Sequence, residues 1–303
     1  RSPLHPNLRV IDKVNGGKAD ALNAGINAAR HALFCGVDAD FILQRDSLRK
    51  MGRVFQNDHS VVAACASVGA ANACALKDGF MGNTELPRAW AARFQIVEHL
   101  RGFRFALMFW SRLDAMLLTT GVFAVFRKEP VLAAGGFRSD ALSENMEIVA
   151  RLHRLLRQEN KPYHIAYVPD PTCWTDVPES WATLKMQWIK RQIARSQSLE
   201  ISRQVFLGRR SGAVGWLGFP FLLLFEWLGP LLEVLGYVVM TLLWLFGMIS
   251  FQAFWTFLLA VIGMGMLLST SALLMDEMAF LSERKFAHTL KLFAAVILEN
   301  CGY

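Results

Sequence analysis

The pattern of hydrophobic and polar residues divides the chain into two parts. Up to about position 210, short apolar runs alternate with amphipathic stretches of helical period, which predicts strands separated by helices. Beyond that position, long apolar runs follow one another with few charged residues between them. We therefore predict an α/β domain over residues 1–212 and a helical membrane region over residues 213–303.

Composition supports this division. The chain is 53% hydrophobic and its mean hydropathy is +0.30, which is too apolar for an ordinary soluble domain. Its net charge of +7 favours contact with an anionic membrane surface and with phosphate-bearing ligands. Because no motif that reads bases accompanies this charge, we expect membrane lipid as a partner and no nucleic acid.

The apolar runs predict how the second part meets the membrane. The run at residues 254–274 is long enough to span a bilayer alone, and the run at 231–249 is long enough if Glu233 lies at the interface. The stretch at 216–227 is shorter and is followed by Gly229-Pro230, which favours an interfacial or re-entrant helix, with a kinked membrane helix as the alternative. We expect an interfacial helix over about 214–228, transmembrane helices over about 231–249 and 253–275, and the start of another from about 290.

Basic residues predict the orientation of these helices. Residues 250–252 contain no Lys or Arg, whereas residues 276–291 carry three basic side chains and Arg209-Arg210 precede the first apolar run. By the positive-inside rule, the first domain and the 276–291 segment are expected in the cytoplasm. The sequence thus predicts a multi-pass protein of the inner (plasma) membrane whose main domain is cytoplasmic.

Periodicity and turn residues predict the elements of the first domain. Strands are expected at residues 8–12, 33–37, 61–75, 120–126 and 164–168, and helices at 19–32, 46–57, 88–116, 129–134, 144–156 and 179–203. Ser143 is expected to cap the helix that starts at Glu144. The helix at 88–116 is rich in Arg and aromatic residues, so it either lies along a membrane face or is an ordinary domain helix with apolar core positions.

One stretch of the domain carries a recognisable chemistry. A glycine-rich turn, Asn15-Gly16-Gly17-Lys18, precedes the first helix, and Asp38 and Asp40 follow the strand after it. Ligands of open α/β sheets bind at this edge, and two carboxylates two residues apart can hold a divalent cation against a diphosphate. The alternative interpretation is a strand-end turn, where Asp is common.

Several motifs in a fixed order resemble a known family. The motifs are Asn15-Gly16-Gly17-Lys18-Ala19-Asp20-Ala21-Leu22-Asn23, Asp38-Ala39-Asp40, Glu144 at the start of a helix, and Cys173-Trp174-Thr175, all before the membrane helices. In this order they resemble the processive family 2 glycosyltransferases, which include the cellulose, hyaluronan and poly-N-acetylglucosamine synthases. The resemblance implies a GT-A-like, Rossmann-type α/β domain followed by interfacial and transmembrane helices.

The resemblance also implies ligands and residue roles. The expected donor is a nucleotide-sugar, in particular a UDP-sugar, and the expected acceptor is a polysaccharide. Lys18 and Asp38 would contact the donor, and Asp40 would hold Mg²⁺ or Mn²⁺. The acceptor side would include Thr120, Gly121 and Trp174, although a buried β-strand is an adequate explanation of the segment that contains Thr120.

The sequence departs from the family where the general base is expected. The family's Glu-Asp pair, whose Asp takes a proton from the acceptor hydroxyl, is Glu144-Asn145 in this chain. An amide cannot accept that proton at neutral pH, so the step is missing unless Glu144 or Glu147 replaces the aspartate. Loss of a general base typically costs about 10²- to 10⁴-fold in rate.

A second departure lies in the family's Gln-x-x-Arg-Trp motif. Aligned on Gln187, this chain has Lys190 in place of Arg and Arg191 in place of Trp. Lys keeps the charge that would pair with the diphosphate but loses the bidentate fork, and Arg replaces an aromatic acceptor platform with a cation.

These departures leave two functions open. The family's first strand and early aspartate would lie upstream of Arg1, so we expect a chain cut at both ends, with another chain as a candidate source of the N-terminal part. One function is a membrane-bound inverting glycosyltransferase that extends a polysaccharide. The other is a catalytically inactive, glycosyltransferase-like subunit with a structural or regulatory role in envelope glycan assembly.

Overall fold

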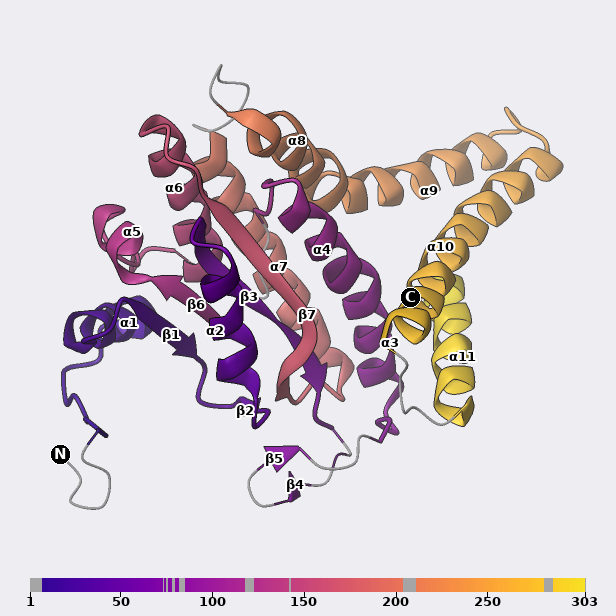
Figure 1. Cartoon of the computed structure of the whole chain (residues 1–303). Helices are drawn as coiled ribbons and strands as arrows, with labels where there is room; N and C mark the ends of the chain where they lie inside the picture. The colour runs from indigo at the N-terminus through magenta and orange to yellow at the C-terminus, as the bar shows by residue number, and fades with distance from the viewer. Residues whose placement is uncertain are drawn as a thin grey trace.

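A computed structural model of the chain describes residues 7–72, 74, 76–77, 80–81, 85–117, 123–141, 143–203, 211–280 and 286–302. A mixed β-sheet with helices on both faces forms the first part, and two long helices extend away from it (Figure 1). The elements up to the sheet's last strand are α1 (Gly17–Ala28), β1 (Leu33–Val37), β2 (Ile42–Leu43), α2 (Ser47–Asn57), β3 (Val61–Ala70), β4 (Leu76–Lys77), β5 (Phe80–Met81), α3 (Trp90–His99), η1 (Leu100–Arg104), α4 (Phe105–Arg112), β6 (Phe123–Arg127), α5 (Lys128–Ala133), α6 (Glu144–Gln158) and β7 (His164–Thr175). After these come α7 (Trp181–Ser202), η3 (Val214–Gly218), α8 (Phe219–Phe221), η4 (Leu222–Trp227), α9 (Gly229–Leu245), α10 (Phe251–Phe280) and α11 (Phe286–Gly302), where η marks a π-helical segment.

The main sheet is built around β3. Its strand order is β1-β6-β3-β7-β2, with β3 parallel to β7 and antiparallel to β6. Residues 61–67 of β3 are all buried, and most have small side chains. A strand buried on both faces needs helices on both sides, and small side chains let those helices approach closely.

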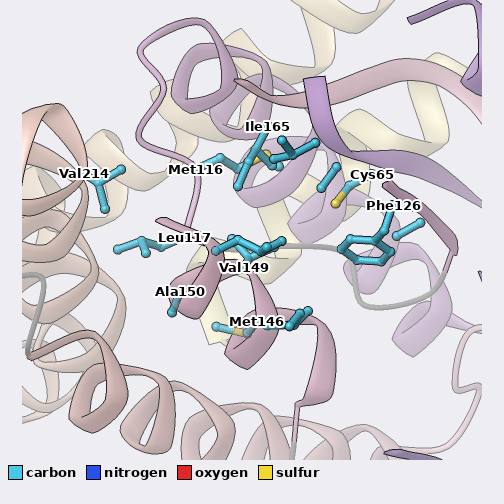
Figure 2. Close-up of a cluster of buried hydrophobic side chains, with 14 of the residues drawn as sticks. Cys65, Met116, Leu117, Phe126, Met146, Val149, Ala150, Ile165 and Val214 are labelled. Atoms are coloured by element: carbon cyan, nitrogen blue, oxygen red, sulfur yellow. The ribbon is translucent and has the colours of Figure 1, made fainter. Parts of the chain in front are cut away.

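One face of the sheet packs against α6. Figure 2 shows Cys65, Phe126 and Ile165 from three strands lying close to Met146 and Val149 of α6, in one buried cluster. The opposite face, formed by the alternate strand residues, packs against α2 through a second buried cluster. The structure therefore confirms the α/β fold class that the sequence predicts.

The start of the chain differs from the prediction. The strand expected at residues 8–12 is not formed, and Val10 and Val14 are 86% and 90% exposed. A strand requires a neighbour for its backbone groups, and among the described residues none lies beside this segment. The first helix also runs from Gly17 to Ala28 instead of over 19–32, whereas Leu33–Val37 is a strand as predicted.

The helical stretch predicted at residues 88–116 is formed by α3, η1 and α4 in succession. Phe94, Val97 and Leu100 are buried against Leu273 of α10 and against α11. The stretch therefore behaves as a domain helix with apolar core positions, and part of its core is supplied by the C-terminal helices.

The C-terminal helices contain one segment, Phe251–Met278, that is long and apolar enough to cross a membrane. The pair Val214–Trp227 and Gly229–Leu245 passes the same test only jointly and bends by 41° between its members. No residue of α9 is buried in the described structure. Helix α10 continues to Phe280 and α11 starts at Phe286, so Asp276, which the sequence places in a loop, lies within a helix.

Buried charges join α10 and α11 to the sheet domain. Arg104 of η1 donates to the Asp276 carboxylate of α10, and both side chains are almost fully buried. One turn earlier, Arg101 donates to Ser269 Oγ at 2.9 Å and pairs with Glu299 of α11 at 3.2 Å. The two arginines therefore neutralise acidic groups on both C-terminal helices, as buried charges require.

This arrangement makes a stability prediction. Replacement of Asp276 by Leu removes the carboxylate that pairs with the buried Arg104, so we expect the free energy of unfolding in detergent to fall by about 3–5 kcal/mol. The double variant Arg104→Met, Asp276→Leu should recover most of that loss, since neither charge remains. Denaturant unfolding measures both effects. Arg138→Met, which removes an exposed pair with Asp140, is the control and should leave the unfolding midpoint unchanged. A stable Asp276→Leu variant would contradict this role of the ion pair.

Candidate functional site

The glycine-rich turn and the strand-end carboxylates lie together. Asn15 Oδ1 accepts a hydrogen bond from the Gly17 amide at 3.0 Å, and Gly17 has a φ of +87°, a conformation that favours glycine. Helix α1 begins there and places Lys18 in its first turn. Lys18 Nζ lies 2.7 Å from Asp38 Oδ1 and 2.9 Å from Asp38 Oδ2. The structure thus brings together the two residues that the sequence assigns to donor binding.

A groove of about 500 Å³ adjoins this ion pair. It is lined only by residues of α1, β1 and the short segments that follow them, and Lys18 and Asp38 are among these residues. Because α1 and β1 run in opposite directions, the N-terminus of the helix meets the carboxyl end of the strand, so Lys18 and Asp38 lie at one end of the groove, and Arg30 and His31 follow the other end of α1. The remaining lining is largely apolar.

The second carboxylate is more open. Residues 38–41 form a turn closed by the Phe41 amide, which donates to the Asp38 carbonyl at 3.3 Å, and Asp40 is exposed. Among the described residues, no cluster of three or more His, Cys, Asp or Glu could hold a metal by itself. A single exposed carboxylate such as Asp40 could bind a divalent cation only together with water and ligand phosphates, a ligand set that Mg²⁺ accepts.

The turn leads directly to an aromatic residue of the predicted acceptor side. Ile42, two positions after Asp40, pairs with Trp174 of β7. The Trp174 ring lies over Gly69 so closely that a Cβ there would be 2.3 Å from a ring carbon, and only glycine fits. The structure thus brings Trp174 to the same corner of the sheet as Asp40. Thr120 and Gly121, the other predicted acceptor residues, lie outside the described residues.

Helix α6 presents the residues expected to act on the acceptor. Glu144 and Asn145 occupy its first turn; Glu144 is half-buried and Asn145 is 8% exposed. Ser143 precedes the helix as expected, but its side chain makes no capping hydrogen bond.

The carboxylate of Glu147 is already occupied. Arg151 Nε and Nη2 each lie 2.5 Å from a carboxylate oxygen of Glu147, which is 1% exposed. A carboxylate in a buried bidentate pair cannot serve as an accessible base. Of the two replacements that the sequence suggests for the missing aspartate, only Glu144 remains.

A buried histidine anchors the same helix. His153 Nε2 lies 2.9 Å from the Met116 carbonyl and Nδ1 lies 2.6 Å from the Tyr163 hydroxyl. Burial lowers the pKa of His153 to about 4, an effect opposed by the Met116 contact and strengthened by Arg157. The imidazole is therefore neutral at physiological pH and serves as a structural hydrogen-bonding group.

The motif helix α7 contacts α3 and not the donor turn. Gln187 Oε1 accepts from Gln95 Nε2 at 3.0 Å, and Arg191 donates to Glu98 at 2.8 Å. The same Glu98 accepts from the Trp188 indole at 3.3 Å. Lys190 is exposed and forms no hydrogen bond or ion pair with another described residue. Of the three predicted motif residues, two thus make structural contacts and only Lys190 remains open to a ligand.

Sequence patterns alone did not identify Glu98 and Arg151 as residues that organise this site, and they gave Asn23 only as the last position of the first motif. Only the spacing of Glu147 and Arg151, four positions apart on a helix, carried a local signal. Asn23 and Glu98 act through contacts that are distant in sequence.

Comparisons with known proteins identify the family of the chain. A family described as "Glycosyltransferase like family 2" matches residues 3–193. A poly-beta-1,6-N-acetyl-D-glucosamine synthase from Staphylococcus aureus (strain COL) is 27% identical over 176 residues, which are 58% of this chain and 38% of that protein. The corresponding synthase from Staphylococcus epidermidis is 26% identical over 178 residues, 59% of this chain and 38% of that protein. The chain therefore spans less than two fifths of the length of these relatives.

Among solved structures, the mannosyltransferase PcManGT from Pyrobaculum calidifontis, in complex with GDP-Man and Mn²⁺, resembles the chain with a TM-score of 0.44 and 17% identity. The match covers 94% of this chain and 67% of that one. The family match includes the glycine-rich turn, both strand-end aspartates and helix α6. The family and the curated relatives support a role in glycosyl transfer. The chain belongs to glycosyltransferase family 2 and has a GT-A-like fold.

Proposed function

We propose that this chain is part of a membrane-bound glycosyltransferase that transfers a sugar, with inversion, from a nucleotide-sugar to a growing polysaccharide. The donor we propose is a UDP-sugar. The observation that carries the proposal is the contact of Lys18 with Asp38 at 2.7 Å, beside the exposed Asp40. A cation and two carboxylates at the carboxyl end of a strand suit a diphosphate and its metal ion.

A divalent cation, Mg²⁺ or Mn²⁺, would be held by Asp40 together with the donor phosphates. When bound, such a cation neutralises negative charge on the diphosphate leaving group. Lys18 supplies a positive charge near the same phosphates, and its pairing with Asp38 keeps the ammonium group directed at the strand end. Trp174, at the same corner, offers an apolar ring surface to a sugar.

The transfer step also requires a base. The acceptor hydroxyl oxygen attacks the anomeric carbon, the nucleotide diphosphate leaves with the electron pair of the broken bond, and the hydroxyl proton passes to a carboxylate. Asn145 cannot accept that proton, and Glu147 is held by Arg151. In an active chain the proton would therefore go to Glu144.

The alternative function is a catalytically inactive subunit that keeps the donor site and contributes structure or regulation to envelope glycan assembly. Two observations favour it: the base position is an amide, and Arg191 of the motif helix pairs with Glu98 in a structural contact. Both functions share the donor site, so they differ in turnover and not in nucleotide binding.

The location we propose is the inner (plasma) membrane, with several membrane passes and the sheet domain in the cytoplasm. The apolar Phe251–Met278 segment and the bent pair before it support this placement. The exposed apolar surface of α9 supports it as well, because such a surface is stable in contact with lipid.

We also propose that a strand from outside the described residues completes the sheet beside β1. The amide of Lys128, the residue after β6, donates to the Ala32 carbonyl, so in the antiparallel ladder the backbone groups of Phe34 and Gly36 face β6. Those of Leu33, Cys35 and Val37 face the other edge. Within the described part of the chain no strand pairs with that edge. Another polypeptide or a further segment of the same protein could supply the strand.

The donor site can be tested by nucleotide binding. The purified chain should bind UDP in a Mn²⁺-dependent manner by isothermal titration calorimetry, and Asp40→Ala should weaken that binding by about tenfold or more, since it removes the proposed metal ligand. Asp140→Ala, at an exposed carboxylate paired with Arg138, is the control and should bind as the unaltered chain does. A folded chain that does not bind UDP with Mn²⁺ would refute the donor site.

Turnover separates the enzyme from the inactive subunit. Asn145→Asp restores a carboxylate, so hydrolysis or transfer of a UDP-sugar should rise by about 10²- to 10⁴-fold if the missing base is the only defect. Glu144→Gln in the unaltered chain is the matched experiment. If the unaltered chain already turns over the donor and Glu144→Gln abolishes turnover, Glu144 is the base. If neither the unaltered chain nor Asn145→Asp turns over the donor when the upstream residues that supply the missing strand are present, the inactive subunit is the correct function.

The open edge can be tested by amide hydrogen exchange. In the protein within its native membrane, the amides of Leu33, Cys35 and Val37 should exchange about tenfold or more slowly than in the isolated chain, because an added strand would accept their hydrogen bonds. The amides of Phe34 and Gly36, already paired with β6, serve as internal controls and should be slow in both samples. Equal and rapid exchange of the first group in both samples would exclude an added strand.

A further inference from the structure

A turn at residues 134–137, far from the donor residues in sequence, is hydrogen-bonded to α1. The side-chain nitrogen Nδ2 of Asn23 donates to the Phe137 carbonyl at 2.8 Å, and the side-chain oxygen Oδ1 accepts from the Phe137 backbone amide at 2.8 Å. The side chain thus satisfies both backbone groups of one residue, as a neighbouring strand would. Both ends of this contact are part-buried, which strengthens the hydrogen bonds relative to an exposed contact.

The turn has the glycines that such a close approach needs. Gly135 and Gly136 have φ values of +88° and +72°, which side-chain-bearing residues rarely adopt. A Cβ on Gly136 would lie 2.6 Å from Asn23 Oδ1. The backbone conformation and the contact with α1 therefore both require glycine at position 136.

Helix α6 holds the same turn from its other side. Arg151 Nη2 donates to the Gly136 carbonyl at 2.5 Å, and Arg151 Nη1 donates to the Ala134 carbonyl. The remaining contacts of this guanidinium are with Glu147, one helical turn earlier. A single planar group therefore joins the first turns of α6 to the turn at 134–137, with Glu147 fixing its orientation.

The sheet also holds the turn at residues 134–137, through contacts of the Phe137 ring. The Phe137 ring is 4% exposed and lies edge-on against Phe126 of β6 at 5.9 Å and Phe34 of β1 at 6.3 Å between ring centroids. The turn is thus fixed by β1 and β6 as well as by α1 and α6.

We propose that Asn23 and Arg151 are positioning residues, which hold the donor turn and the first turn of α6 at a fixed separation through residues 134–137. Asn23 lies five positions after Lys18, about 7.5 Å along the helix axis. Glu147 lies one turn after Glu144. The donor residues and residues 144–145 are therefore joined by a short series of hydrogen-bonded groups: Asn23, residues 134–137, Arg151 and Glu147. The role rests on the proposed function, because it concerns the alignment of a donor with an acceptor.

The experiment measures whether binding of a ligand at the donor site slows amide hydrogen exchange in α6. With saturating UDP and Mn²⁺ as the probe, hydrogen exchange of the full chain should slow at residues 16–19 and 38–41 and also at residues 143–151. Asn23→Leu keeps the side-chain shape but removes both hydrogen bonds. In this variant we expect UDP affinity to stay within about threefold and protection at 16–19 and 38–41 to persist, while protection at 143–151 is lost.

Arg151→Lys is the second variant. An ammonium group cannot donate to two carbonyls and both Glu147 oxygens at once. The Arg151→Lys variant should therefore lose the ligand-induced protection at residues 143–151, as Asn23→Leu does. The matched controls are Asn27→Leu on the exposed side of α1 and Arg154→Lys on the exposed side of α6, and both should retain the wild-type pattern. Protection at 143–151 that survives in Asn23→Leu and in Arg151→Lys would overturn the positioning role.

Failure of the proposed function can be distinguished from failure of the positioning role. If the unaltered chain binds no UDP with Mn²⁺, the donor site fails, and exchange without ligand then tests the link alone. In that case Asn23→Leu should speed exchange at residues 147–151, whose amides are hydrogen-bonded within α6, by about tenfold or more relative to Asn27→Leu. Equal exchange in the two variants would overturn the link independently of the function.

Discussion

The rest of the structure depends on the burial of β3 between two strands and two helical layers. Its residues from Val61 to Ser67 are buried, and the run of small side chains at positions 63–66 lets α2 and α6 approach the sheet from opposite faces. Because β3 also pairs in parallel with β7, it carries Trp174 to the corner where β2 follows Asp40. A large side chain in the middle of β3 would separate the layers and would displace α6, which carries Glu144 and Asn145. The small side chains of β3 therefore set the distance between the sheet and α6, and with it the position of Glu144 and Asn145.

The sequence predicted those parts of the fold that local pattern determines. The run Leu33–Val37 is a strand because its residues are apolar and it is bounded by a helix and a turn, and Lys18 meets Asp38 because strand and helix are adjacent in the chain. Residues 8–12 also suggest a strand, through Leu8, Val10 and Ile11, but they form none, since a strand depends on a neighbour that the pattern does not report. The pairs of Asn23 with Phe137 and of Arg104 with Asp276 join residues separated by 114 and 172 positions, so no local rule predicts them. The sequence also suggested Glu147 as a base, which its pairing with Arg151 excludes.

The two halves of the candidate site differ in how they relate to the family pattern. The residues proposed for the donor keep the family motif and lie together, as the contact of Lys18 with Asp38 shows, whereas α7 departs from the motif at Lys190 and Arg191. Arg191, which stands where the family has Trp, shares Glu98 with the neighbouring Trp188. The substituted residue has thus become part of the packing between α7 and α3, and the aromatic function has not been transferred to it. The contacts of Arg191 and Trp188 with Glu98 therefore account for the packing of this part of α7 on α3.

The buried pair of Arg104 with Asp276 has a consequence for the order in which the protein is built. Synthesis proceeds from the N-terminus, so Arg104 leaves the ribosome 172 residues before Asp276. When α10 emerges, its apolar length can enter a bilayer, but the carboxylate near its end has no counter-charge in lipid. The folded sheet domain, with α3 and η1 already in place, supplies that counter-charge. The burial of Asp276 therefore depends on the earlier folding of the sheet domain, because α10 and α11 reach their packed position only against α3 and η1.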